Sequence, residues 1–474
     1  RRTIPTMIRF LASLALLSVA GCTSIPVATP TQPDAPSLAP RPYVQVRHPD
    51  WAKSAVLYQI NTRQFTKEGT FAAAQKQLPR LKDLGVDILW LMPINPIGEK
   101  NRKGTLGSPY SVKDYYGVNP EFGTLDDLKA FVDAAHALGM HVILDWVANH
   151  TSPDNPLVTE HPDWYETDWK GDFHPTPWTD WHDIIDLDYS QTGLREYMAG
   201  AMEYWVREAG VDGFRCDVAG YVPVDFWDDV RTRLDAIKPV FMLAEWDTRD
   251  LHQHAFDATY AWAWKDAARD IAQGKSDASR MTSLMERHLG SWPHDAYQMI
   301  YTENHDQNAW EGTPREFYGD ALDTFMTLQF VMDGIQLIHN GQEAGNEHRL
   351  AFFERDPIVW RASPQAALIR TLIHLKKANP ALWNGAAGGP YEPVVTDNGK
   401  QIVSFARRKD GNTVIALFNL SAEPASFTIT DGPVDGTYTD FQTGGEMTLS
   451  LSSAKPMTLP AWGFHVLLSG SKND

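Results

Sequence analysis

Residues 142–150 read Val142-Ile143-Leu144-Asp145-Trp146-Val147-Ala148-Asn149-His150, a short β-rich apolar run that ends in polar side chains. Val and Ile favour strands, and a run of this length is typical of a strand buried in an α/β protein. Polar residues follow at the point where the strand would end, which is where α/β barrels place their chemistry. The stretch therefore predicts a buried strand with functional residues at its carboxyl end.

Seven further β-rich runs share this pattern and alternate with amphipathic helical segments. Together the eight candidate strands are Val56–Ile60, Ile88–Met92, Val142–Val147, Gly213–Asp217, Val240–Glu245, Ala258–Trp262, Gln298–Thr302 and Ile335–Asn340. The helical segments include Leu125–Leu138, Leu194–Glu208 and Phe226–Ile237. Eight alternations predict an α/β fold of the (β/α)8 TIM barrel type, with a doubly wound open sheet as the alternative.

The chain divides into further regions around this barrel. Residues 149–190 are too long for an ordinary loop and contain several Trp residues, which predicts a small inserted domain that walls a cleft after the third strand. Past residue 393 the helical pattern gives way to β runs, which predicts a C-terminal antiparallel β-sandwich over residues 393–474. The catalytic barrel would then occupy residues 50–148 and 191–392.

The amino-terminal segment predicts export. Residues 7–22 hold one Arg, an apolar run too short to span a bilayer and the ending Val19-Ala20-Gly21-Cys22. This ending resembles a bacterial lipobox, so residues 1–21 would be a lipoprotein signal peptide and Cys22 the lipidation site, with an ordinary signal peptide as the alternative. Residues 22–49 are rich in Pro and would form a tether. We expect an exported protein that is lipid-anchored to the cell envelope, periplasmic or surface-facing, on the outer membrane if the source is Gram-negative.

Composition narrows the class of ligand. The 474 residues carry 42 Lys and Arg against 60 Asp and Glu, a formal net charge of −18, which argues against nucleic acid as a partner. Seventeen Trp, 16 Tyr and 20 Phe residues are enough to raise sugar stacking as a possibility beside core packing.

Acidic side chains recur at the ends of the predicted strands. Asp217 ends the fourth strand, Glu245 ends the fifth and Asp306 follows the seventh. Three acids at one mouth of a barrel, without a Ser-His-Asp or Cys-His pattern, suit glycosidic chemistry or a site for a hard metal ion.

These motifs resemble the α-amylase family, glycoside hydrolase family 13, over roughly residues 50–470. The resemblance rests on residues 145–150, on Gly213-Phe214-Arg215-Cys216-Asp217, on Ala244-Glu245 and on Asn304-His305-Asp306. It also includes residues 109–115 and 119–124, and five motifs in order at barrel spacings make a strong match.

The resemblance implies a retaining mechanism with Asp217 as nucleophile, Glu245 as acid/base and Asp306 bracing the sugar in the transition state. It further implies that His150 and His305 bind sugar hydroxyls and that Tyr110 stacks under the ring. Arg215 lies on the same strand face as Asp217 and would lower its pKa, while acidic and apolar neighbours would raise that of Glu245. We expect Trp246 to form an acceptor-side platform.

Calcium is a second implication of the resemblance. Relatives hold Ca²⁺ between barrel and inserted domain at positions that match Asn149 and Asp186, and no organic cofactor is expected. Starch-cleaving members often carry Lys-His where this chain has Gly220-Tyr221, which weakens both the calcium prediction and that of a typical endo-acting amylase.

Three functions remain open at this stage. The first is a retaining hydrolase of α-glucosidic bonds, α-1,4 above all, in maltooligosaccharides or starch fragments. The second is a transglycosylase or isomerase on the same scaffold. The third is a catalytically silent carbohydrate-binding protein, which the presence of all three acids disfavours.

Overall fold

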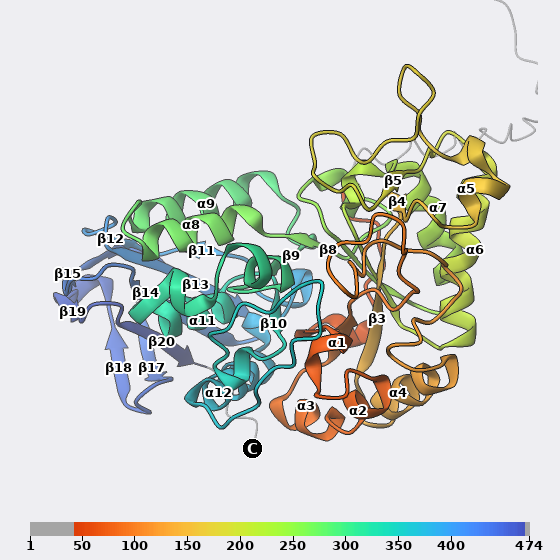
Figure 1. Ribbon diagram of the computed structural model, residues 1–474. Coiled ribbons are helices and arrows are strands. Elements are labelled where there is room, and N and C mark those ends of the chain that lie inside the picture. The colour runs from red at the N-terminus through yellow and green to blue at the C-terminus, as the bar shows by residue number, and fades with distance from the viewer. Residues whose placement is uncertain (1–41, 470–474) are drawn as a thin grey trace, which may run out of the picture. The chain divides into compact units, whose positions relative to one another are not determined.

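Eight parallel strands close into a barrel in the computed structural model, which describes residues 42–469 (Figure 1). The strand order is β1-β10-β9-β8-β7-β6-β3-β2, and β1 pairs with both β2 and β10. This closure confirms the barrel and excludes the open sheet. The barrel strands are β1 Leu57–Ile60, β2 Ile88–Leu91, β3 His141–Trp146, β6 Gly213–Cys216, β7 Phe241–Ala244, β8 Ala258–Tyr260, β9 Tyr297–Ile300 and β10 Ile335–His339.

Helices cover the outside of the barrel, where the strands present apolar side chains. One apolar cluster, which includes Leu57, Trp90 and Leu337, fills the barrel, and a larger one lies between strands and helices. Thr124 and Asp127 form a capping box that begins α4. The longer helices are α3 Leu78–Leu84, α4 Leu125–Ala137, α6 Thr192–Glu208, α7 Val224–Asp235, α8 Trp262–Ala272, α9 Ala278–Ser291, α11 Leu322–Val331 and α12 Pro364–Ala378.

The chain between β3 and α6 forms a separate excursion above the barrel, which Figure 1 shows in yellow. It contains β4 His150–Thr151, α5 Leu157–Glu160 and β5 Ile185–Asp186, and β4 pairs antiparallel with β5. Trp164 is buried in it, Trp169 and Trp178 are exposed, and Trp181 faces the cavity described below. Of the Trp residues predicted to form a wall beside the cleft, Trp181 is therefore the one that lines the cavity.

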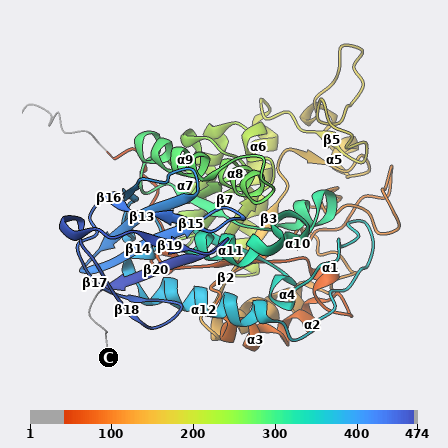
Figure 2. The same cartoon turned by 90° about the vertical axis from the view of Figure 1, so that its left-hand side faces the viewer.

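The carboxyl-terminal strands form an antiparallel sheet of six, in the order β11-β13-β14-β20-β17-β18. Figure 2 shows these strands, in blue, gathered on one side of the barrel. Both faces of β13 and β14 are buried: Phe405 and Phe418 belong to the large cluster around the barrel, and Ile402 and Ile415 to a second core. The sheet strands are β11 Glu392–Pro393, β13 Ile402–Lys409, β14 Asn412–Asn419, β17 Gly436–Asp440, β18 Glu446–Leu449 and β20 Phe464–Ser469, and two-stranded ladders pair β12 Val395–Thr396 with β16 Ile429–Asp431 and β15 Ala425–Phe427 with β19 Met457–Leu459.

The predicted tether ends earlier than residue 49. Val44 and Val46 are buried, and His48 Nδ1 lies 2.7 Å from the buried Asp257 Oδ1, so residues 43–49 pack against the barrel. This ion pair raises the pKa of His48 to about 9, although burial alone would lower it. The signal peptide, Cys22 and the first part of the tether lie outside the described residues.

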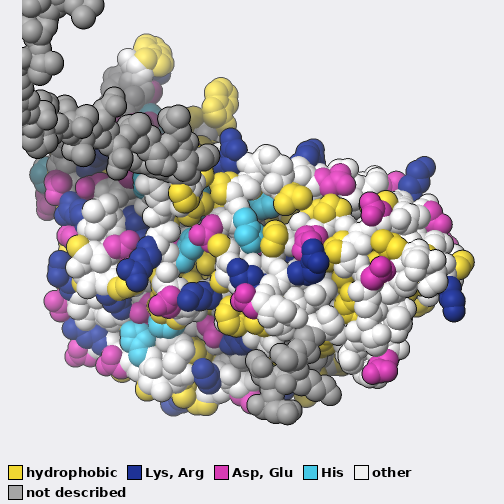
Figure 3. All heavy atoms as spheres, turned by 180° about the vertical axis from the view of Figure 1, so that it is seen from behind, with side chains coloured by type: hydrophobic (Ala, Val, Ile, Leu, Met, Phe, Trp, Pro, Cys, Tyr) yellow, Lys and Arg dark blue, Asp and Glu magenta, His cyan; other side chains and the backbone are white. Residues whose placement is uncertain are grey.

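Charge is spread over the surface. On the face shown in Figure 3, acidic side chains mix with basic ones wherever grey atoms do not cover them, so the acid excess forms no single patch there. Among residues 42–469, no helix is both long and apolar enough to cross a membrane.

Candidate active site

The three predicted catalytic acids meet in one cavity at the carboxyl ends of the barrel strands. Asp217 follows β6, Glu245 follows β7 and Asp306 comes after β9. The cavity has a volume of about 680 Å³, within the range usual for small-molecule sites. Its lining residues are Lys103, Ser108, Tyr110, His150, Asp180, Trp181, His182, Asp183, Ile184, Asp217, Val218, Glu245, His305, Asp306, Trp310, Phe352 and Phe353.

Arg215 is the centre of the site's charge network. Its Nη1 lies 2.8 Å from Asp145 Oδ1 and 2.9 Å from Asp217 Oδ1, and its Nη2 lies 2.9 Å from Glu245 Oε2. The Arg215 side chain is fully buried, and its Nε donates to Tyr260 Oη at 3.1 Å. One planar guanidinium thus fixes the two predicted catalytic carboxylates against each other, which a point charge could not do.

A second network orients the predicted sugar-binding residues. Tyr110 Oη donates to Asp145 Oδ2 at 2.9 Å and lies 2.8 Å from His305 Nε2. Gln59, on β1, lies 2.6 Å from His305 Nδ1 through its amide nitrogen and accepts from the His305 backbone N–H at 3.2 Å. Since the tyrosine proton is directed to Asp145, His305 carries its proton on Nε2 and accepts from Gln59 on Nδ1.

Burial changes the pKa of three acids in the site. Burial raises the pKa of Asp217 well above its ordinary value, the charge of Glu245 raises it further, and Arg215 lowers it. Arg215 thus lowers the pKa of Asp217 as predicted, but burial outweighs it, because that one guanidinium is shared among three carboxylates in a dry site. Burial also raises the pKa of Asp306, and raises that of Asp145 to about 6.

Both site histidines are neutral at physiological pH. Burial lowers the pKa of His150 to about 4 and holds that of His305 well below its usual range. His150 Nε2 lies 4.0 Å from Asp217 Oδ2, so it flanks the acid without a direct hydrogen bond. Neutral imidazoles can both donate to and accept from hydroxyl groups, which suits a polyhydroxyl ligand.

The backbone after Asp217 is strained. Val218 has a φ of +36°, in the left-handed region that a β-branched residue rarely adopts. This conformation directs the Val218 N–H to Glu245 Oε2 at 2.8 Å. Strain of this kind costs about 1–3 kcal/mol and is common at functional sites, and here it helps to hold Glu245 in place.

Trp246 lies beside the cavity but does not line it. A Cβ built on Gly220 would come within 2.0 Å of the Trp246 ring, which also packs against Tyr221 and Trp262. The Gly220 that departs from the Lys-His pattern is therefore what makes room for Trp246. Tyr221 is half exposed at the edge of this cluster.

Several functional residues were not found from the sequence. Gln59 orients His305, Trp90 Nε1 donates to Asp145 Oδ2 at 3.0 Å, and Tyr260 contacts Arg215. The signal available in the sequence was a polar or amphipathic side chain within an apolar strand. Lys103, Trp310, Phe352 and Phe353 also line the cavity, but none of them belongs to one of the motifs.

Two groups of side chains in the described part of the chain have the composition and spacing of metal ligands. Asp186 lies with Glu166 and His174, and its Oδ1 accepts from Thr176 Oγ1 at 2.5 Å and from Asn149 Nδ2 at 3.2 Å. The predicted calcium ligands Asn149 and Asp186 are thus in contact. Burial raises the pKa of Asp186 to about 6.

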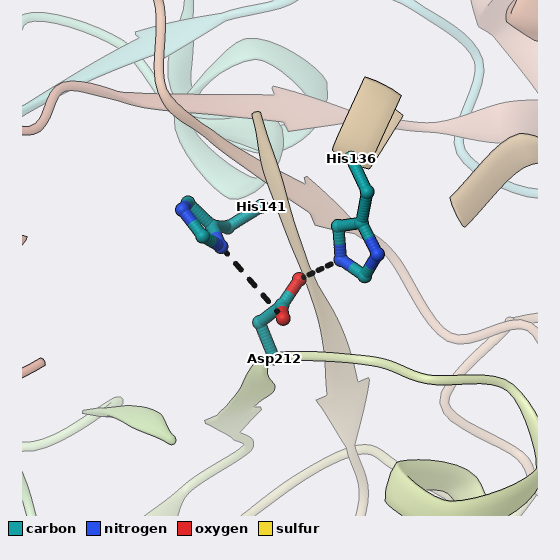
Figure 4. Close-up of side chains that lie close together, drawn as sticks. All are labelled: His136, His141 and Asp212. Atoms are coloured by element: carbon teal, nitrogen blue, oxygen red, sulfur yellow. Dashed lines mark hydrogen bonds and ion pairs between the residues drawn. The ribbon is translucent and has the colours of Figure 1, made fainter. Parts of the chain in front are cut away.

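The second group lies at the opposite end of the barrel strands (Figure 4). His136 Nε2 lies 2.7 Å from Asp212 Oδ2, His141 Nδ1 lies 3.7 Å from Asp212 Oδ1, and Lys238 Nζ reaches the same Oδ1 at 2.8 Å. Burial would raise the pKa of Asp212, but these basic groups outweigh it and hold the pKa well below its ordinary value. Because Lys238 already supplies a cation, this group acts as an ion-pair cluster that joins α4, β3 and β6.

Residues 59–381 match the family described as "Alpha amylase, catalytic domain". The chain is a member of the alpha-amylase family. The (β/α)8 barrel with a C-terminal β domain is the fold of that family.

This alpha-amylase family member is similar to two solved structures over most of its length. One is an alpha-amylase from Lactobacillus plantarum, with 35% identity, a TM-score of 0.78, and coverage of 88% of this chain and 99% of that one. The other is a noncanonic maltogenic alpha-amylase, AmyB, from Thermotoga neapolitana, with 31% identity, a TM-score of 0.80, and coverage of 89% and 100%.

Sequence relatives of this alpha-amylase family member carry several activities in their names. The alpha-amylase MalA of Haloarcula japonica is 28% identical over 438 residues, which is 88% of this chain and 63% of the relative. The chain thus spans less than two thirds of that relative. Other relatives are named cyclomaltodextrinase and alpha-1,4-glucan:maltose-1-phosphate maltosyltransferase, so the shared property is action on α-glucans.

Proposed function

We propose that this protein is a retaining hydrolase of α-1,4-glucosidic bonds in maltooligosaccharides or starch fragments. The observation that carries the proposal is the pairing of Asp217 and Glu245 on the single guanidinium of Arg215, inside a sugar-sized cavity. The names of its relatives support an α-glucan as the substrate.

The geometry supports a double-displacement mechanism. Asp217 attacks the anomeric carbon, while Glu245 gives its proton to the leaving oxygen and the C–O bond breaks. Water then gives a proton to Glu245 and displaces Asp217, so the α configuration is retained. Asp306 faces the same cavity and would stabilise positive charge on the sugar ring.

The neighbouring groups position the sugar. Tyr110 is held through its hydroxyl, which leaves its ring available to stack under the sugar, and neutral His150 and His305 would bind the hydroxyl groups. Trp246 would lie under the leaving sugar at the rim rather than within the cavity.

Product analysis tests this function. Maltoheptaose mixed with the protein should give shorter maltooligosaccharides that appear first as α-anomers by NMR. Asp217→Asn should lower kcat by at least about 10³-fold with unchanged circular dichroism, whereas Asp228→Asn, on α7 and outside the cavity, should keep wild-type rates. Initial β-anomers, or full activity of Asp217→Asn, would contradict the mechanism.

A transglycosylase is the second candidate. The acceptor edge at Trp246 and Tyr221 is aromatic and open, with Tyr221 half exposed, so a sugar hydroxyl could replace water as the acceptor. Longer products formed from maltotriose at high concentration would favour this activity over hydrolysis.

Calcium fits the residues between barrel and inserted segment. Asp186 is a buried carboxylate with which no Lys or Arg of the described residues forms an ion pair, and the carboxylate of Glu166 and the side chain of Asn149 lie nearby. A bound Ca²⁺ would supply the missing positive charge and fasten this segment to the barrel. We expect calcium to raise the Tm and Asp186→Asn to abolish that increase.

We also propose that Cys22 is lipidated and anchors the exported protein to the cell envelope. Radiolabelled palmitate should enter the full chain and not the Cys22→Ala variant, and that variant should leave the membrane fraction.

A further inference from the structure

Three separate segments that line the active-site cavity are bonded to one another. They are Lys103 from the loop after β2, residues 180–183 from the inserted segment, and Phe352 with Phe353 from the loop after β10. We call these residues the cavity wall. Segments from three loops would leave gaps for a long sugar chain unless they were joined.

The loop after β2 is bonded to the inserted segment. Lys103 Nζ donates to Asp180 O at 2.9 Å and lies 3.4 Å from Asp183 Oδ1, and Asn101 Nδ2 donates to His182 O at 3.1 Å. Figure 1 shows this loop, in orange, running beside the excursion that carries β4 and β5. The first joint of the cavity wall is therefore closed.

The same loop is bonded on its other side to the loop after β10. Leu106 N donates to Phe353 O at 3.0 Å, and Thr105 N donates to Glu354 Oε1 at 2.7 Å. The buried guanidinium of Arg63 lies beneath this joint and donates to Gly107 O at 2.9 Å and to Phe352 O at 3.4 Å. The cavity wall is thus continuous from the inserted segment to the loop after β10.

Ring contacts place the cavity wall on the donor side of the cleaved bond. The Phe352 ring lies nearly parallel to that of Tyr110, 6.2 Å between centroids, and 6.2 Å from that of His305. Tyr110 and His305 are the residues expected to hold the sugar that is transferred to Asp217. The leaving sugar departs past Glu245, toward Trp246 and the half-exposed Tyr221, where the site is open.

We propose that the cavity wall closes the donor side, so that the enzyme removes short units from the non-reducing ends of α-glucans and does not cut within chains. The inference rests on the proposed function and specifies its mode of action. A chain enters with its non-reducing end against the cavity wall, and the rest extends over the acceptor edge. Cyclic glucans, which have no end, should then be poor substrates.

A capped substrate tests the proposal. Maltoheptaose and its derivative with a 4,6-O-ethylidene group on the non-reducing sugar are compared at equal concentration, with β-cyclodextrin as a third substrate. We expect cleavage of free maltoheptaose and at least 100-fold slower cleavage of the other two. Similar rates on the free and capped chains would overturn the inference and leave the hydrolase function intact, whereas inertness toward all three would overturn the function and the inference with it.

Opening the cavity wall should change this selectivity. Lys103→Ala removes the bond to the inserted segment, and Phe353→Ala shortens the aromatic part of the wall; each should raise the capped-to-free rate ratio at least tenfold. Lys113→Ala is the matched control, because Lys113 is similarly exposed, pairs with Glu99 and Asp154, and does not line the cavity. An unchanged ratio in both wall variants, with wild-type circular dichroism, would show that the cavity wall does not set the mode of action.

Discussion

Replacement of Arg215 by Lys tests the charge network at the centre of the site. Arg215 bridges Asp145, Asp217 and Glu245 with contacts of 2.8–2.9 Å. Burial and the charge of Glu245 raise the pKa of Asp217, and the charge of Arg215 acts against them. Two unit charges about 4 Å apart interact by about 4 kcal/mol at an effective dielectric constant of 20, which corresponds to about three pKa units. Lysine keeps the charge but loses the fork, so we expect about one third of that effect, roughly one pKa unit.

The sign follows from the role proposed for Asp217. The nucleophile must be ionised, so a higher pKa moves the acidic limb of the kcat/KM profile to higher pH. This limb reports the coupled carboxylates of the free enzyme together. Profiles on p-nitrophenyl α-maltotrioside should therefore show a limb shifted upward by about one unit. An unshifted limb, or one shifted to lower pH, would refute this account.

A second buried arginine supplies the control. Arg231 forms a 2.8 Å ion pair with the fully buried Asp257, which directly precedes β8 at the end of the barrel opposite to the cavity. Arg231→Lys also replaces a buried, ion-paired arginine, so it should destabilise the fold about as much as Arg215→Lys does. It should leave the acidic limb of the kcat/KM profile where it is. A shift in both variants would mean that general loosening, not the bridge, controls the limb.

Three further changes probe the support of the site and the fold. Gly220→Ala should displace Trp246 and cost about 1–3 kcal/mol in urea unfolding, whereas Gly200→Ala, whose new Cβ meets no atom closer than 3.6 Å, should cost nothing. Gln59→Leu should lower kcat/KM about tenfold on maltotriose with little change in Tm, because the imidazole that it orients is freed; an unchanged kcat/KM would remove Gln59 from the site. Asp212→Asn should destabilise the fold by about 1–3 kcal/mol at pH 7. Since the folded-state pKa of Asp212 is depressed, this stabilisation is present above about pH 4 and is lost as the pH falls below that value, so the two unfolding midpoints should converge in acid.

The sequence predicted the barrel well because its signals are local. Each strand is a short β-rich run, and the ends of all eight were placed to within two residues of their observed positions. The acids at the strand ends were found for the same reason, since the barrel itself brings the end of β6 next to that of β7.

Other features depended on contacts between distant parts of the chain. The support of His305 by Gln59 crosses 246 residues, and the bond between Thr105 and Glu354 crosses 249. Neither contact leaves a pattern in the sequence near it. The net rise in the pKa of Asp217 was missed for a related reason: the sequence shows that Arg215 is near, but not that the site is buried and that the same guanidinium serves three acids.

The donor side and the acceptor side of the cavity differ, and this difference relates the enzyme's mode of cleavage to the acceptor, water or sugar, that it uses. If the cavity wall closes the donor side, the sugar bound covalently to Asp217 is short, because the wall leaves no room for further units at its non-reducing end. The acceptor side, at Trp246 and Tyr221, is accessible to water and to sugar alike. Gly220 leaves room for Trp246 to pack on this side, whereas family members with Lys at the position of Gly220 would carry a charge there. Gly220→Lys should therefore displace Trp246 and lower the ratio of transfer to hydrolysis measured on maltotriose at high concentration. A ratio that stays constant, with the variant folded and active, would mean that the Trp246 cluster takes no part in holding the acceptor.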